Sequence, residues 1–201
     1  MKPLYWLCRT SATISSKLLF RTRIIGSENL VGPNERGTII ASNHQSFLDP
    51  PLVATAYKGE IHFLARETLF KGMFGKLIAA INAVPINQNG ADLASLKTII
   101  TQVKKGNRVL VFPEGTRTPD GTLQPAAAGI GLIVAKSQAL VQPIRIEGAY
   151  DALPRNRSSL KLAPITITIG KPLDFSHMGK VRSKEQYQEI ADTIMAKIAE
   201  L

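Results

Sequence analysis

The fold is decided by the stretch Thr38-Ile39-Ile40-Ala41-Ser42-Asn43-His44-Gln45-Ser46-Phe47-Leu48-Asp49. Its first residues form a short apolar run, which is typical of a buried strand, and the run ends directly in polar residues. The segment Val109 to Arg117 repeats this pattern, because Val109-Leu110-Val111-Phe112 is followed by Pro113-Glu114-Gly115-Thr116-Arg117. Ligands of open α/β sheets bind outside the carboxyl ends of the strands. We therefore expect both polar segments to lie at one edge of a sheet.

Strand-like and helix-like segments alternate along the rest of the chain. Strands are expected at residues 23–25, 38–41, 61–65, 84–86, 108–112, 141–146 and 165–169, and helices at 52–57, 73–81, 91–105, 126–137 and 185–201. Ser183 and Gln186 form a capping box in front of the last helix. The alternation predicts an α/β fold, a single domain whose mixed, mostly parallel sheet is covered by helices.

Composition limits the function classes. The 201 residues suffice for one domain with a sizeable core, and the formal net charge of +10 suits an anionic partner such as nucleic acid, anionic lipid or a phosphorylated substrate. Aromatic residues make up 6% and do not alternate with Lys or Arg, which argues against binding of single-stranded nucleic acid. The single cysteine, Cys8, excludes an internal disulfide, and we assign it no role.

Residues 1–21 are predicted to form a basic amphipathic segment in front of a single domain at 22–201. No apolar stretch is long enough to span a membrane. Two interpretations stay open: the segment lies in a membrane interface, or it packs on the domain as an ordinary helix. We expect peripheral attachment to the cytoplasmic face of the membrane, and we expect catalysis on a water-soluble acceptor to survive removal of residues 1–20. The apolar residues are Leu4, Trp6, Leu7, Ile14, Leu18, Leu19 and Phe20, and the basic ones are Lys2, Arg9, Lys17, Arg21 and Arg23.

His44 is the candidate general base, because a neutral imidazole is poised to accept a proton near neutral pH. Asp49 lies one turn further on and could hold one ring nitrogen protonated, which leaves the other free to take a proton from a substrate hydroxyl. The alternative is that both residues cap a turn. Arg117 can form a forked contact with a phosphate, and Glu114 could fix Arg117 or contact substrate hydroxyls. The alternative there is a Glu–Arg pair that stabilises a loop.

Four blocks resemble, in order and spacing, the glycerolipid acyltransferase family, which contains the 1-acylglycerol-3-phosphate O-acyltransferases. They lie at residues 43–50, 69–86, 112–117 and 142–144. The resemblance covers roughly residues 22 to 172. It implies O-acyl transfer, in phospholipid biosynthesis, from a thioester on coenzyme A or acyl carrier protein to a lysophospholipid hydroxyl at a membrane surface. It also assigns roles by position: His44 as base, Asp49 as the group that orients it, and Glu114, Gly115, Thr116 and Arg117 as the acceptor-binding loop.

Two positions depart from the family pattern. Gln88 stands where the second block usually ends in an arginine, and Ala126-Ala127-Ala128-Gly129 stands where many members carry a Phe-Lys pair before the glycine. Two expected cations are therefore missing. Their absence puts lysophosphatidic acid in doubt as the acceptor, and a lysophospholipid with a larger or less anionic head group is then an alternative.

No cofactor and no metal site is expected, because nucleotide-binding glycine loops are absent and His62 and His177 have no ligand partners at suitable spacing. Arg155, Arg157 and Lys161 form either a solvated basic loop or a surface for head groups or an acidic carrier protein. Two rival functions remain. One is a non-catalytic basic protein that binds membrane or nucleic acid, and the other is a hydrolase that uses the same His/Asp pair. The chain lacks a G-x-S-x-G elbow, which favours direct transfer without a covalent acyl-enzyme.

Overall fold

The computed structural model describes residues 2–86, 93–157, 159–179, 181 and 183–201. A seven-stranded sheet forms its centre, in the order β1-β7-β6-β2-β5-β3-β4, and all pairs are parallel except β6 with β7. The strands are β1 (Arg23–Ile25), β2 (Thr38–Ser42), β3 (His62–Arg66), β4 (Ala83–Ile86), β5 (Arg108–Val111), β6 (Leu140–Glu147) and β7 (Thr166–Ile169). The predicted α/β fold is confirmed.

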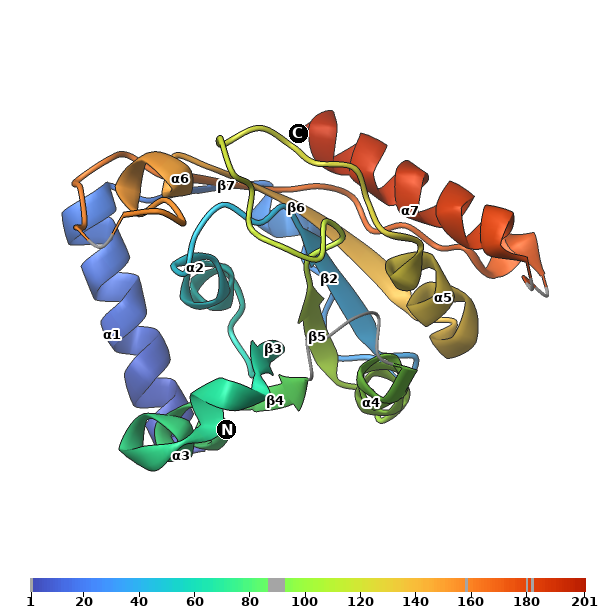
Figure 1. Ribbon diagram of the computed structural model, residues 1–201, viewed down its shortest axis with the longest axis horizontal. Helices are drawn as coiled ribbons and strands as arrows, with labels where there is room; N and C mark the ends of the chain where they lie inside the picture. Colours follow the sequence, from blue (N-terminus) through green and yellow to red (C-terminus); the bar gives the residue numbers. More distant parts are fainter. Residues whose placement is uncertain (1, 87–92, 158, 180, 182) are drawn as a thin grey trace.

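Helices cover both faces of the sheet (Figure 1). One face packs against α4 (Leu93–Lys104), α5 (Ala128–Ser137) and α7 (Lys184–Ala199). The other packs against α1 (Pro3–Phe20), α2 (Asp49–Ala56) and the short α6 (Ala149–Ala152). The remaining elements are α3 (Gly72–Ala80) and three 3-10 turns, η1 (Ser27–Asn29), η2 (Glu67–Phe70) and η3 (Ser176–Met178).

The sequence patterns located these elements well. Every predicted strand is present within two residues of its predicted ends, and β7 alternates half-buried Thr with buried Ile as expected. The capping box of Ser183 and Gln186 is confirmed by hydrogen bonds in both directions. Two helix starts differ slightly from the prediction: the first turn of α2 begins at Asp49, directly before Pro50 and Pro51, and α5 begins at Ala128 rather than 126, because Ala127 has an extended backbone. Residues 91 and 92 of the predicted helix 91–105 lie outside the described residues.

The N-terminal helix α1 packs on the domain through one face. Tyr5 and Phe20 are buried, and the Tyr5 hydroxyl accepts a hydrogen bond from the backbone N–H of Ile61. The Arg9 guanidinium donates to the carbonyls of Ala54, Thr55 and Tyr57, which satisfies the free carbonyls at the end of α2. Arg9 therefore stabilises the packing of α1 against α2, and its charge does not face outward toward lipid. The opposite face carries an exposed apolar stripe at helical spacing: Leu4, Leu7, Ile14 and Leu18.

No helix among the described residues is both long enough and apolar enough to cross a bilayer.

Candidate active site

The loop between β2 and α2 is fixed to the centre of the sheet by Asn43. Its side-chain amide donates to the Ile146 carbonyl (2.9 Å), and its side-chain oxygen accepts from the Ile146 N–H (2.7 Å). The Asn43 side chain thereby pairs with β6 just where the β2 ladder ends. This anchoring sets the next residue, His44, at the carboxyl edge of the parallel strands.

His44 and Asp49 meet as the sequence predicts. His44 Nδ1 lies 2.8 Å from Asp49 Oδ2, and the same oxygen accepts the backbone N–H groups of Gln45 (2.6 Å) and Ser46 (2.8 Å). An oxygen that already accepts two N–H bonds cannot donate, so Nδ1 carries the proton and Nε2 is left as an acceptor. Burial raises the pKa of Asp49, and the three hydrogen bonds to Oδ2 oppose this rise because they favour the carboxylate.

The segment after β5 is joined to His44 through backbone and ring contacts. The Phe112 ring stacks on the imidazole with 3.7 Å between centroids and 9° between planes. The Glu114 carboxylate accepts the His44 N–H (3.1 Å), and the Thr118 N–H donates to the His44 carbonyl (2.8 Å). The two polar segments, about 65 residues apart in sequence, therefore form one site.

One alternative for these residues, a Glu114–Arg117 pair, is not found among the described contacts. Arg117 lies over the Phe47 ring, 3.6 Å from its centroid, and the Glu114 carboxylate holds the His44 backbone instead. Arg117 Nη1 and Glu114 Oε2 are each buried without a hydrogen-bond partner among the described residues. Burial raises the pKa of Glu114 to about 7. The site thus keeps an unused guanidinium donor, which suits an anionic ligand.

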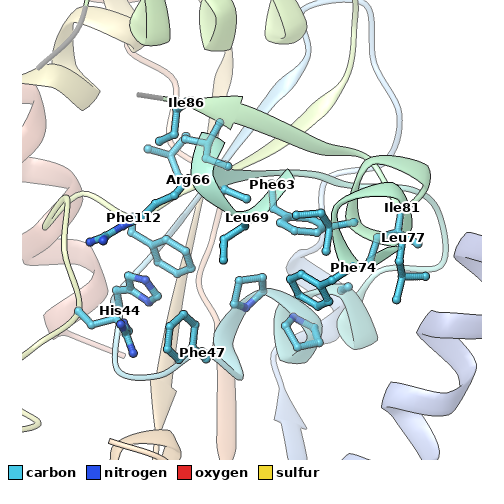
Figure 2. Close-up of a pocket in the computed structure, with 18 of the residues that line it drawn as sticks. His44, Phe47, Phe63, Arg66, Leu69, Phe74, Leu77, Ile81, Ile86 and Phe112 are labelled. Carbon is cyan, nitrogen blue, oxygen red and sulfur yellow. The ribbon is translucent and has the colours of Figure 1, made fainter. Parts of the chain in front are cut away.

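A largely apolar cavity of about 610 Å³ opens beside these groups. His44, Gly115, Thr116 and Arg117 line it, whereas Asp49 and Glu114 stand behind the lining. Gly115 has a positive φ of 70°, which favours glycine in the tight turn after Phe112. Figure 2 shows His44 and Phe112 at one side of the cavity and Leu77 and Ile81 at the other. Helix α1 supplies part of the wall through Tyr5, Cys8, Arg9 and Ala12.

Sequence reasoning missed Arg66 and gave Arg155 no definite role, yet both line the cavity with Arg117. Arg155 Nη1 donates to Thr116 Oγ1 at 3.4 Å. Burial lowers the pKa of Arg117, and the positive charges of Arg155 and Arg66 lower it further. Arg66 could have been found from its place at the carboxyl end of β3, where ligands of such sheets bind. Arg157 and Lys161 of the basic cluster do not line the cavity.

The three arginines of the cavity come from positions other than Gln88 and Ala127, the two that depart from the family pattern. Ala127 is exposed, and its N–H donates to the Pro113 carbonyl (2.9 Å). Gln88 lies outside the described residues. His62 is the first residue of β3 and therefore lies at the amino ends of the strands, away from the site at their carboxyl ends. His177 Nδ1 lies 2.9 Å from the carbonyl of Asp174. In the part of the chain that the structure describes, no cluster of three or more His, Cys, Asp or Glu could hold a metal ion.

Comparisons with known proteins agree with this geometry. A family model described as "Acyltransferase" matches residues 21–147. A 1-acyl-sn-glycerol-3-phosphate acyltransferase of Bacillus subtilis is 27% identical over 98% of this chain and 96% of its own. One of Pseudomonas aeruginosa is 32% identical, over 69% of this chain and about half (52%) of its own length. The crystal structure of the 1-acyl-sn-glycerophosphate acyltransferase PlsC of Thermotoga maritima is 27% identical and superposes with a TM-score of 0.80, covering 98% of this chain and 78% of that one. These matches exclude the non-catalytic interpretation: the chain belongs to the glycerolipid acyltransferase family and is an acyltransferase.

Proposed function

We propose that this enzyme transfers an acyl group from an acyl thioester to the free hydroxyl of 1-acylglycerol-3-phosphate. The observation that carries the proposal is the pairing of His44 with Asp49 beside an arginine whose Nη1 has no described partner. The names of the similar proteins favour the same acceptor.

In the proposed reaction, His44 Nε2 takes the proton of the acceptor hydroxyl while its oxygen attacks the thioester carbonyl carbon. Asp49 stabilises the imidazolium that results, because its carboxylate lies against Nδ1. The new bond between the acceptor oxygen and the acyl carbon remains, and the bond between the acyl carbon and the thioester sulfur breaks. The proton on Nε2 then passes to the departing thiolate, so that no covalent acyl-enzyme is needed.

The acceptor phosphate is proposed to bind at Arg117, with Arg66 and Arg155 as further cations. All three line the cavity, and Arg155 is held at Thr116 of the same loop. These arginines offset the cations missing at Gln88 and Ala127. They therefore support a phosphomonoester as the acceptor over the alternative of a less anionic head group. The apolar remainder of the cavity suits the acyl chains.

Peripheral attachment to the cytoplasmic face of the membrane remains part of the proposal. Its support is the outer stripe of α1, Leu4, Leu7, Ile14 and Leu18, next to the exposed Trp6 and Lys17. The donor is a thioester of coenzyme A or of acyl carrier protein, and the test uses both.

The test measures thioester cleavage and lipid product together, with and without 1-acylglycerol-3-phosphate, for the wild type and His44→Ala. Acceptor-dependent cleavage that matches product formation, and a loss of about 10² or more in His44→Ala, would support transfer. Cleavage that does not need the acceptor would identify a hydrolase. Faster turnover of lysophosphatidylcholine or lysophosphatidylethanolamine than of 1-acylglycerol-3-phosphate would reject the proposed acceptor.

A further inference from the structure

The Phe112 ring lies flat against one face of the His44 imidazole, closer than two uncharged aromatic rings usually lie. The two centroids are 3.7 Å apart and the ring planes differ by 9°, and Figure 2 shows the rings side by side. Neutral aromatic pairs prefer an offset or edge-to-face arrangement with centroids about 4.5–7 Å apart, because the faces of both rings are negative. The observed stack is therefore a poor arrangement for a neutral imidazole.

The same stack is a good arrangement for an imidazolium. A cation within about 6 Å of a ring centroid is attracted by the negative face of the ring. In the proposed reaction the His44 ring gains a proton while the acceptor oxygen attacks, so the ring is neutral before the reaction and positively charged in the transition state. A contact that is stronger in the transition state than in the ground state raises turnover, whereas a contact of equal strength in both does not.

The surroundings of the imidazole increase the weight of this attraction. The His44 side chain is only 18% exposed, so little water screens the contact. Asp49 carries the opposite charge and lies beside Nδ1. However, three guanidinium groups line the same cavity and oppose a further positive charge. They belong to Arg66, Arg117 and Arg155. A group that favours the imidazolium in addition to Asp49 therefore helps the proton transfer.

The turn after β5 holds the Phe112 ring in this position. The Phe112 carbonyl accepts the N–H of Gly115 at 3.0 Å. Pro113 restricts the residue before it to an extended backbone, which limits the directions in which the Phe112 side chain can point. Two residues further on, the Glu114 carboxylate accepts the backbone N–H of His44. The turn is thus tied to His44 next to the stack, and it keeps the two rings face to face.

We propose that Phe112 is a positioning residue of the transfer step, whose ring face stabilises the imidazolium that His44 becomes when it takes the proton of the acceptor. This rests on the proposed function, since only a His44 that accepts a proton becomes a cation. The site then uses two aromatic rings for different purposes. Phe47 lies against the permanent charge of Arg117, whereas Phe112 lies against a charge that exists only during the reaction.

The test replaces Phe112 with phenylalanine analogues that carry one, three or five ring fluorines. Fluorine withdraws electrons from the ring face and weakens its attraction for a cation, while the shape of the side chain changes little. The single-turnover rate constant of acyl transfer, measured at saturating acceptor, should fall stepwise along the series, by about tenfold or more for the pentafluoro ring. The acceptor concentration that gives half the maximal rate should stay the same.

The matched control is the same fluorine series at Phe175. This residue is also half-buried and lies beside a histidine, His177, but the two centroids are 6.4 Å apart and Phe175 does not line the cavity. Its analogues should keep the wild-type rate. Phe112→Leu is a second variant, because it keeps an apolar side chain without a ring face, and it should also lose about tenfold in rate.

Two results would overturn the inference. One is a rate constant that stays level along the Phe112 series, with melting temperatures like that of the wild type, because the ring would then only fill space. The other is a level rate constant with a rising acceptor requirement, because the ring would then act on binding and not on the imidazolium. Failure of the proposed function would look different, since the wild type itself would then release thiol without needing the acceptor.

Discussion

Replacement of Asp49 by Asn tests the chemistry of the site with little change in shape. The Asn oxygen can still accept the N–H groups of Gln45 and Ser46, but the negative charge beside the His44 ring is lost. The Nδ1–Oδ2 distance of 2.8 Å places the two charge centres about 4 Å apart, where an ion pair at an effective dielectric constant of about 20 is worth about 4 kcal/mol. Because the imidazolium forms only during the reaction, turnover should fall by about 10³-fold.

The assay is thiol release from the acyl thioester under saturating acceptor, measured well below the melting temperature. Asn places an NH₂ group where Asp49 Oδ1 has no described partner, which should lower the free energy of unfolding by about 1–3 kcal/mol. The control is Asp174→Asn, which removes a carboxylate paired with Arg36 away from the cavity and should keep wild-type turnover. If a folded Asp49→Asn enzyme turned over within tenfold of the wild type, His44 would not depend on Asp49 for charge.

Three further outcomes follow from the contacts. Arg117→Lys should raise the KM for the acceptor about tenfold or more and leave that for the donor unchanged, because an ammonium group cannot reproduce the fork or the stack on Phe47; a rise confined to the donor would contradict this. Because burial raises the pKa of Glu114 to about 7 from its usual value near 4.5, folding takes up a proton between these values, so stability contributed by this group falls as pH rises through that window. The melting temperature of Glu114→Gln, compared with that of the wild type, should therefore increase as the pH is raised from 5 to 8. Arg9→Ala should lower the free energy of unfolding by about 2–3 kcal/mol in denaturant titrations, against no comparable loss in the exposed Arg21→Ala.

The fold and the reacting pair could be predicted because their signals are local. The apolar run of β2 ends just before Ser42, Asn43 and His44, and the spacing from His44 to Asp49 matches a turn at the start of α2. Arg66, Arg117 and Arg155 could not be grouped in the same way. Arg66 is the last residue of β3, whereas Arg117 and Arg155 follow β5 and β6, and only the order of the strands in the sheet brings those three ends to one cavity.

The role of Glu114 was missed for a different reason. Its partner is the backbone N–H of His44. Because nearly every residue carries a backbone N–H, the sequence does not indicate which of them a carboxylate will bind. Phe47 was likewise quoted in the deciding stretch without a role, since an aromatic residue in a loop does not indicate which cation will lie over it.

The two faces of α1 bear on how the surface of this enzyme can be engineered without loss of stability. Truncation of residues 1–20, which the sequence suggested would spare catalysis, would remove a wall of the cavity and the Arg9 contacts at the end of the helix that begins with Asp49. Surface redesign avoids this loss. Polar substitutions confined to Leu4, Leu7, Ile14 and Leu18 would change only exposed positions and leave Tyr5, Arg9 and Phe20 in their packing. In this helix, the exposed apolar side chains and the residues that support the domain lie on separate faces and can be altered independently.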